Sequence, residues 1–181
     1  MTLWASLGPK YWMTASPEDL FAYLDGLGIA HQTHWHEAVF TVDESNGLKA
    51  AMPGIHTKNL FLKDKDGTFI LISAEAHTLI RLNRLHRHIA TKRLSFGSPE
   101  DMLALLGVTP GSVTAFALMN DAGGKIRFIA DAALFSADPV NFHPLTNTGT
   151  TAISRDEFKR FVESTGRNWE VVDFAALNAP E

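Results

Sequence analysis

Short apolar runs bounded by polar turn segments occupy the middle of this chain, a pattern typical of β-strands. One run extends from His56 to Leu62, and a second extends from Thr68 to Ser73. The segment between them, Lys63–Gly67, is polar and ends in glycine. The pattern therefore predicts a β-hairpin whose turn lies at this segment.

Apolar residues spaced three and four apart predict helices elsewhere. Leu20, Leu24 and Leu27 recur at this spacing after Ser16-Pro17, a pair suited to an N-cap and a first helical turn. The same reasoning predicts further helices over 45–52, 79–89, 98–107 and from 154 onward, a helical turn over 131–135, and strands over 31–42, 113–119, 126–129, 141–153 and 171–174. Ser154 and Glu157 are predicted to form a capping box.

The order of these elements predicts an α/β (α+β) fold with a mixed, mostly antiparallel sheet flanked by helices. Strands and helices do not alternate regularly enough for a doubly wound parallel sheet. A chain of 181 residues with no repeat and no long linker is most simply one domain with a substantial core.

Lys58 interrupts the apolar character of the first hairpin strand. Alternate residues of a strand share a face, so Lys58 should point the same way as Leu60 and Leu62. Asn59 should point the opposite way. An ammonium group on an apolar face is costly unless it has a partner or reaches a cleft, although a lysine at a strand end can also extend its ammonium to solvent.

Three segments around this strand resemble the YbaK/ProX family, the freestanding prolyl-tRNA editing proteins. They occur in the family's order: Thr57-Lys58-Asn59-Leu60-Phe61-Leu62-Lys63-Asp64, Gly111-Ser112-Val113-Thr114, and Asn141-Phe142-His143-Pro144-Leu145-Thr146-Asn147-Thr148. The resemblance spans roughly Ser16 to Phe174. It implies a YbaK/aminoacyl-tRNA editing domain over 13–181, and it leaves 1–12 as an N-terminal extension outside the family pattern.

The resemblance also implies roles for particular residues. It makes Lys58, Asn59, Gly111 and His143 the candidates for catalysis, with Lys58 lining the pocket for the mischarged amino acid. The candidates for substrate binding are Thr57, Ser112, Val113, Thr114 and Asn147. For His143, a structural role in its strand is an open alternative. Ala115 departs from the family, which usually has proline there.

Composition narrows the possible environments. The chain has no cysteine, which excludes a disulfide framework, a thiol nucleophile and a cysteine-based zinc site. No apolar run approaches the roughly 20 residues that span a membrane, and the first residues do not read as a signal peptide. The expectation is a cytoplasmic protein without a cofactor, not bound to a membrane, and monomeric.

Charge is distributed unevenly along the chain. Residues 76–99 contain five basic residues, Arg81 and Arg84 among them, and no acidic residue. Since the whole chain carries −4 and this window +5, the remainder carries −9. We expect Arg81, Arg84 and His88 to share a helix face that meets tRNA phosphates, while Leu79 faces the core. The alternative is a solvated basic helix.

Other catalytic motifs are missing from the sequence. His34 and His36 have a spacing that could bind metal, but no convincing third ligand accompanies them, so no metal site is predicted. There is no Gly-x-Ser-x-Gly elbow, no P-loop and no Gly-x-Gly-x-x-Gly.

The resemblance thus implies a trans-editing deacylase that hydrolyses the ester of mischarged tRNA(Pro). The form of the third segment, His-Pro-Leu-x-Asn-Thr, indicates the branch that removes alanine. Two alternatives are open: editing of another misacylated tRNA carrying cysteine or serine, and a noncatalytic module that binds the tRNA acceptor end. The expected partners are the acceptor end of a mischarged tRNA and prolyl-tRNA synthetase.

Overall fold

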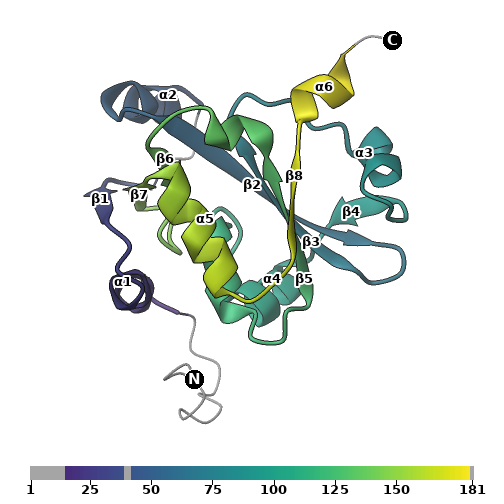
Figure 1. Cartoon of the computed structure of the whole chain (residues 1–181), viewed down its shortest axis with the longest axis horizontal. Coiled ribbons are helices and arrows are strands. Elements are labelled where there is room, and N and C mark those ends of the chain that lie inside the picture. Colours follow the sequence, from purple (N-terminus) through teal and green to yellow (C-terminus); the bar gives the residue numbers. More distant parts are fainter. Residues whose placement is uncertain (1–14, 39–41, 180–181) are drawn as a thin grey trace.

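The computed structural model describes residues 15–38 and 42–179 (Figure 1). The helices are α1 (Pro17–Gly26), α2 (Val42–Ala51), α3 (Leu82–His88), α4 (Pro99–Leu106), α5 (Arg155–Ser164) and α6 (Phe174–Asn178), with two 3-10 helices, η2 (Ala115–Asn120) and η3 (Ala132–Phe135). The strands are β1 (His31–Trp35), β2 (Ile55–Asp64), β3 (Phe69–Glu75), β4 (Leu94–Phe96), β5 (Ile126–Asp131), β6 (Val140–Phe142), β7 (Gly149–Ile153) and β8 (Trp169–Val172).

The strands form one mixed sheet in the order β1-β7-β6-β2-β3-β5-β8, with β4 paired to β2 outside this path. The pairs β1–β7, β6–β7, β2–β3 and β2–β4 are antiparallel, whereas β2–β6, β3–β5 and β5–β8 are parallel. The predicted α/β fold with a mixed, mostly antiparallel sheet flanked by helices is confirmed. The hairpin is confirmed as well, as β2 and β3.

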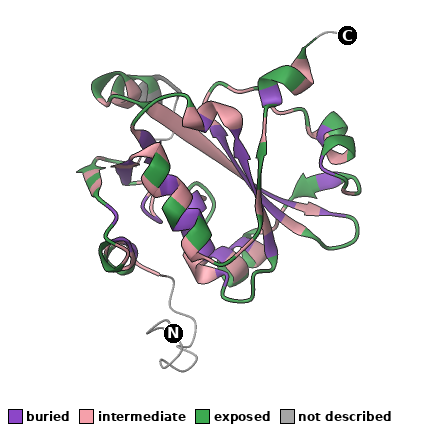
Figure 2. Cartoon of the chain, viewed as in Figure 1, coloured by how far each residue is buried: buried purple, intermediate pink, exposed green. Residues whose placement is uncertain are grey.

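The two faces of the sheet bury separate apolar clusters. The larger cluster packs α1, α4, η2 and α5 against one face, and its buried members include Leu20, Phe116 and Phe158. The smaller cluster, with Leu85 and Phe174, packs α3 and α6 against the other face. In Figure 2 the buried residues follow the central strands and the inward side of α5.

Side-chain caps explain where several helices begin. Ser16, Ser98 and Ser154 each accept a hydrogen bond from the backbone N–H three residues later, as the sequence predicts. The capping box predicted at Ser154 is only half formed, because the Glu157 carboxylate accepts from Arg160 instead. Gly107 ends α4 in the left-handed conformation, with φ of 64°, which glycine adopts readily.

The structure corrects the prediction for residues 113–119. That segment is not a strand: Ala115–Asn120 forms the 3-10 helix η2, capped by the Thr114 side chain. Its residues from Ala115 to Leu118 are all buried. A fully buried apolar run carries no periodicity that separates a strand from a helix. The apolar composition of this segment therefore did not distinguish between the two.

Other predicted boundaries also move. The predicted strand 141–153 is two antiparallel strands, β6 and β7, joined by a turn, and the predicted strand 31–42 ends at Trp35 within the described part of the chain. Leu79 was predicted to face the core but is 53% exposed, because α3 begins only at Leu82. The N-terminal extension 1–12 and residues 39–41 lie outside the described residues. In the part that the structure describes, no helix has the length and apolar character needed to cross a membrane.

Candidate functional site

Lys58 lies in β2 opposite Ala74 of β3. As predicted, it shares a sheet face with Leu60 and Leu62, which belong to or pack against the smaller apolar cluster. Its ammonium donates to the backbone carbonyl of Thr78, just beyond β3. Among the described residues, no carboxylate lies within ion-pair distance of it. A half-buried cation is therefore held by a backbone dipole without a neutralising charge.

The residue that receives Lys58 is itself anchored. The Thr78 hydroxyl donates to the Asp131 carboxylate at 2.6 Å. The same carboxylate accepts from the backbone N–H groups of Glu75 at 3.2 Å and Ala133 at 3.1 Å. Asp131 is 2% exposed, so this connection fixes the carbonyl that orients Lys58.

Asn59 points to the opposite face of β2, as the alternation predicts. Its side-chain oxygen accepts from the hydroxyl of Ser73, its neighbour on β3, at 2.5 Å. Next to it, the Thr57 hydroxyl donates to the backbone carbonyl of Asn141 on β6 at 2.8 Å. Thr57 and Asn59 thus tie β2 to β6 and β3, and the side chains of Lys58 and Asn59 are not brought together.

His143 follows β6 directly, and its ring is anchored on β7. Its Nδ1 lies 3.0 Å from the backbone oxygen of Gly149. Because a carbonyl can only accept, Nδ1 carries the proton, and Nε2 of the neutral ring is left as an acceptor. Burial lowers the pKa of His143 below its ordinary value, the Gly149 carbonyl acts in the opposite sense, and the nearby His36 lowers the pKa further.

His36 is a neighbour of the site that the sequence had considered only as a metal ligand. Its Nε2 lies 2.9 Å from the Thr150 hydroxyl, and its Nδ1 lies 2.7 Å from the backbone oxygen of Glu37. His36 and His143 are therefore anchored on consecutive residues of β7. The spacing of His34 and His36 did not lead to a predicted metal site. Within the described residues, no group of three or more potential ligands could hold a metal ion.

The glycine loop lies against the turn that carries His143. Gly111 has φ of +91°, and a Cβ there would lie 3.7 Å from the side-chain nitrogen of Asn147. Ser112 and Thr114 are buried, and the Thr114 hydroxyl caps η2 by accepting from the Phe116 N–H at 3.3 Å. The Thr114 side chain therefore serves the loop itself. Val113 is half-buried and packs against the larger cluster.

Several backbone N–H groups of this loop are not used in hydrogen bonds among the described residues. The N–H of Ser112 is used by the carbonyl of Thr109 at 3.0 Å. The N–H groups of Gly111, Val113 and Thr114 have no acceptor among the described residues. Neighbouring backbone donors without a partner form an arrangement that can stabilise an oxyanion.

Ala115 keeps the backbone shape that a proline would fix. It is the first residue of η2, and Thr114 before it is extended, with φ of −154° and ψ of 152°. This extended conformation is the one that precedes proline, and the first helical position accommodates proline well. The departure from the family pattern therefore does not alter the local path of the chain.

Arg81 and Arg84 are exposed at the start of α3, the short helix that covers the face on which Lys58 lies. Arg81 is the N-cap residue and makes no side-chain capping bond. Neither guanidinium has an ion-pair partner among the described residues. Their charges remain available to an anionic partner.

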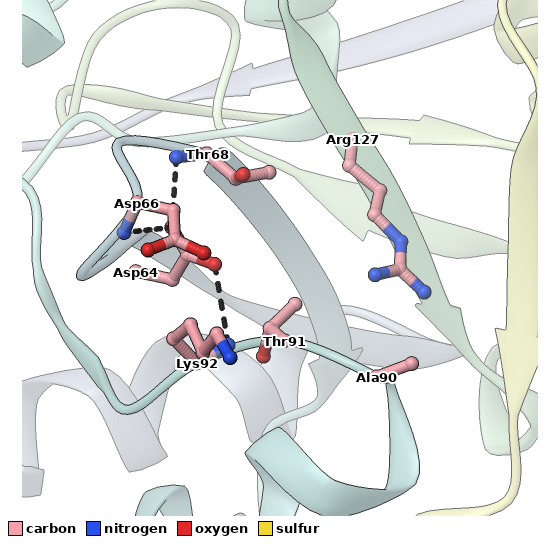
Figure 3. A pocket seen from close by; sticks show the side chains of 7 residues that line it. All are labelled: Asp64, Asp66, Thr68, Ala90, Thr91, Lys92 and Arg127. Atoms are coloured by element: carbon pink, nitrogen blue, oxygen red, sulfur yellow. Dashed lines mark hydrogen bonds between the residues drawn. The ribbon is translucent and has the colours of Figure 1, made fainter.

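A pocket of about 500 Å³ opens elsewhere, at the hairpin turn, and none of the predicted site residues lines it (Figure 3). The Asp64 carboxylate accepts from three backbone N–H groups there, those of Asp66, Thr68 and Lys92. Arg127 binds Glu170 through two nitrogens, at 2.5 and 2.9 Å. Asp64 and Arg127 thus have partners within the protein, and the bonds to Asp64 hold the turn in place.

Similarity to known proteins identifies the family of this chain. Residues 36–161, more than half of the chain, match the family model described as the aminoacyl-tRNA editing domain. The chain belongs to this family. The matched range begins at His36 and contains Lys58, the glycine loop and His143, whereas α1 and β8 lie outside it. The resemblance to the YbaK/ProX family is thereby confirmed.

Relatives in two kingdoms match over most of their length. The prolyl-tRNA synthetase associated domain-containing protein 1 of Xenopus laevis is 34% identical over 162 residues, which cover 87% of this chain and 96% of the relative. The prolyl-tRNA editing protein ProX of Acetoanaerobium sticklandii is 28% identical, over 85% of this chain and 94% of the relative.

Solved structures share the fold of this editing domain. A candidate trans-editing enzyme for prolyl-tRNA synthetase superimposes with a TM-score of 0.66 at 19% identity, over 93% of this chain and 98% of that structure. At this identity the superposition speaks for the fold alone, and it agrees with the single editing domain seen here.

Proposed function

We propose that this protein is a trans-editing deacylase that hydrolyses the ester of mischarged tRNA(Pro), with Ala-tRNA(Pro) as its principal substrate. The observation that carries the proposal is the family match over 36–161 in a chain that retains Lys58. A relative named as a prolyl-tRNA editing protein supports tRNA(Pro) as the nucleic acid.

Hydrolysis needs little assistance from the protein, because an aminoacyl ester is already activated. A water oxygen attacks the ester carbonyl carbon, and the carbonyl oxygen gains negative charge. The bond to the terminal ribose then breaks, and the ribose oxygen leaves with a proton. The products are the free amino acid and tRNA with its hydroxyl restored. The protein must orient the water and support the oxyanion.

The described residues can fill these roles. The free N–H groups of the Gly111 loop support the oxyanion. The neutral His143 offers Nε2 as an acceptor that orients the water. Lys58 holds the aminoacyl carbonyl or the ribose-phosphate region by a charge-assisted hydrogen bond, after exchanging the Thr78 carbonyl for the substrate. Asn59 and Thr57 act indirectly, because they fix the position of β2.

Substrate choice follows from size. An editing site sized for alanine admits small side chains and excludes the correct, larger amino acid, as in a double sieve. Binding of the nucleic acid is assigned to the exposed Arg81 and Arg84, and the names of relatives support an association with prolyl-tRNA synthetase.

The proposal is tested with purified protein and a panel of esters: alanine, cysteine, serine and proline, each on tRNA(Pro). We expect faster release of alanine than in buffer alone, and no acceleration with proline. Faster release of cysteine or serine than of alanine would retain the deacylase and change its substrate. No acceleration with any ester, although tRNA binds, would indicate the noncatalytic module.

A further inference from the structure

Trp35, the last residue of β1, exposes 53% of its surface next to the candidate site. Large exposed apolar side chains are uncommon in the described part of the chain. The others are Leu79, Phe96, Leu103 and Val171. Of the two aromatic residues in this group, Phe96 lies on β4, at the side of the molecule away from β1 (Figure 1). Of these two aromatic residues, Trp35 is the one next to the strand and turn that hold His143.

The indole is held in place on one side. It packs edge-on against Phe21 of α1, with ring centroids 6.2 Å apart and planes at 77°. Gly149 lies directly opposite it in the β1–β7 ladder. A Cβ on Gly149 would lie 3.0 Å from both the indole and the ring of Pro144. Glycine at 149 therefore lets the indole lie close to β7 while much of its surface stays open to solvent.

The same two residues connect Trp35 to His143. The carbonyl of Gly149 accepts the Nδ1–H of His143 at 3.0 Å, and Pro144 is the next residue in the chain. An open aromatic surface thus stands at the turn that carries a candidate catalytic side chain. Phe21 and the backbone at Gly149 fix the orientation of the indole, and the Gly149 carbonyl fixes that of the histidine.

We propose that Trp35 is the stacking surface for the terminal base of the tRNA acceptor end. This inference rests on the proposed function, because the ester at His143 is attached to the terminal ribose. The base of that nucleotide is attached to the same ribose, so it must lie one sugar away from the ester. The acceptor end is single-stranded, and proteins bind unpaired bases by stacking them on aromatic side chains. Trp35 thereby supplies affinity for the end that every tRNA shares, while the basic residues of α3 contact phosphates.

The test is a binding cycle with a labelled acceptor-stem microhelix that ends in an unpaired CCA. Its partner probe lacks only the terminal base. Each is titrated against the wild-type protein, Trp35→Ala, Trp35→Phe and the control Phe96→Ala, with fluorescence anisotropy as the readout. Phe96→Ala removes an aromatic ring that is even more exposed, at 67%, and lies on β4, away from β1.

We expect Trp35→Ala to weaken binding of the complete microhelix roughly 5- to 150-fold, the range for one stacked base. Trp35→Phe should retain most of the affinity, and Phe96→Ala should change little. With the probe that lacks the terminal base, wild type and Trp35→Ala should bind alike, because the partner of the indole is already gone. Equal losses for both probes would overturn the inference.

The cycle separates this inference from the proposed function, because it uses uncharged RNA and requires no hydrolysis. Thermal unfolding of each variant accompanies the titrations. If Trp35→Ala is unfolded, the wild type and Trp35→Phe are compared with the two probes instead. Removal of the terminal base must then weaken wild-type binding by the same factor, and an equal affinity of the wild type for both probes overturns the stacking role. If the protein deacylates tRNA but the effects of Trp35→Ala and of the missing base are independent, the editing function is retained and only the stacking role of Trp35 is rejected.

Discussion

The ammonium of Lys58 is bound by one backbone carbonyl and no carboxylate within the described residues. A cation held in this way is oriented but keeps its charge available for a ligand. We predict that Lys58→Ala lowers kcat/KM for ester hydrolysis about 100-fold or more, the cost of losing one oriented donor. The melting temperature should change little, because no ion pair is broken.

Lys63 provides the matched control. It lies on the same strand with the opposite orientation and pairs with Asp101 at 3.3 Å on the surface. Lys63→Ala should leave hydrolysis unchanged. A large fall in the melting temperature of Lys58→Ala alongside the loss of activity would make Lys58 a structural residue instead.

The protonation of His143 gives a prediction of pH dependence. Its pKa is lowered from an ordinary 6.5, so the neutral ring persists below that pH. The acid limb of kcat/KM should therefore fall below pH 6.5, and His143→Gln should remove that limb together with most activity. A pH–rate profile measures both. An acid limb at or above pH 6.5, or one that survives in His143→Gln, would assign the titration to another group.

Folding stability carries the same sign. As the pH falls from 6.5 toward the lowered pKa, the unfolded chain binds a proton before the folded chain does, so the free energy of unfolding decreases. Urea unfolding at pH 5 and pH 7.5 should show a smaller decrease in His143→Gln than in the wild type. Equal decreases would mean that burial of His143 does not contribute.

What the sequence could predict at the residue scale depended on distance along the chain. The opposite orientations of Lys58 and Asn59 follow from strand alternation, and the structure agrees. The partners of His36 and His143 could not be predicted in this way. His36 meets Thr150, 114 positions away, only because β1 pairs with β7. Such contacts come from strand order, which local patterns do not specify.

At the scale of elements, caps and turns were the reliable signals. The starts of α1, α4 and α5 were predicted from serine followed by proline or acid, and the side-chain bonds are present. The apolar segment before Asn120 was predicted as a strand and is η2. The predicted strand 171–174 overlaps β8, but its last residue, Phe174, begins the short helix α6. Burial on all sides removed the periodicity in the first case.

Helix α3 carries the prediction for binding of tRNA. Arg81 and Arg84 are exposed at its start, in a window without acids. We expect Arg81→Ala/Arg84→Ala to raise KM and flatten the dependence of affinity on salt, because fewer counterions are released from the RNA on binding. The slope of log K against log salt should fall by about 0.7 to 0.9 for each lost phosphate contact.

A control of equal charge is available in Lys125→Ala/Lys159→Ala, at the turn before β5 and on α5. This pair should leave the salt dependence unchanged. If both double variants reduce the slope equally, the effect is one of net charge. If neither does, α3 is only a solvated surface.

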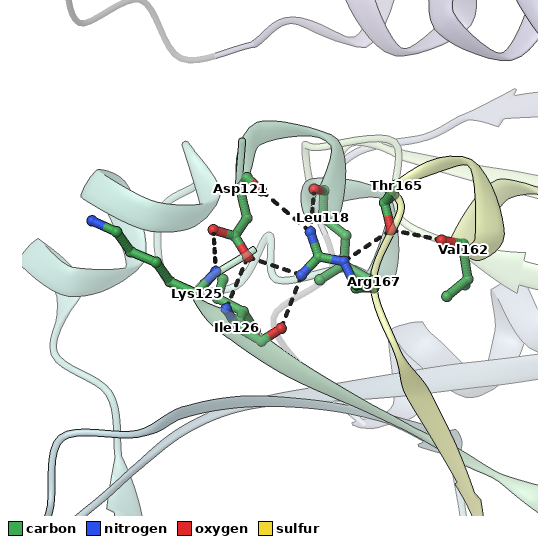
Figure 4. A network of polar contacts seen from close by, with 7 residues as sticks. All are labelled: Leu118, Asp121, Lys125, Ile126, Val162, Thr165 and Arg167. Atoms are coloured by element: carbon green, nitrogen blue, oxygen red, sulfur yellow. Dashed lines mark hydrogen bonds and ion pairs between the residues drawn. The ribbon is translucent and has the colours of Figure 1, made fainter. Parts of the chain in front are cut away.

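At the scale of the whole molecule, a buried ion pair joins the C-terminal segment to the larger core (Figure 4). The side chains of Arg167 and Asp121 are 4% and 2% exposed and lie 2.8 Å apart. Arg167 also donates to the carbonyls of Ile126 at 2.9 Å and Leu118 at 3.1 Å. The pair therefore ties η2 and the start of β5 to the chain that follows α5.

Removal of one partner leaves the other buried and charged. Arg167→Met should lower the free energy of unfolding by about 3–5 kcal/mol, measured by urea denaturation. Arg160→Met on α5 breaks a more exposed pair with Glu157 and should cost less than about 1 kcal/mol. Equal costs for the two variants would show that burial does not set the strength of the Arg167 pair.

The proposed hydrolysis of mischarged prolyl-tRNA in trans is tested most simply by the release of labelled alanine from Ala-tRNA(Pro). The purified protein is assayed beside Pro-tRNA(Pro) under the same conditions, with Lys58→Ala as the inactive reference. We predict rapid release of alanine, intact Pro-tRNA(Pro), and a rate near that of buffer for Lys58→Ala. A wild-type rate equal to that of buffer would contradict the account.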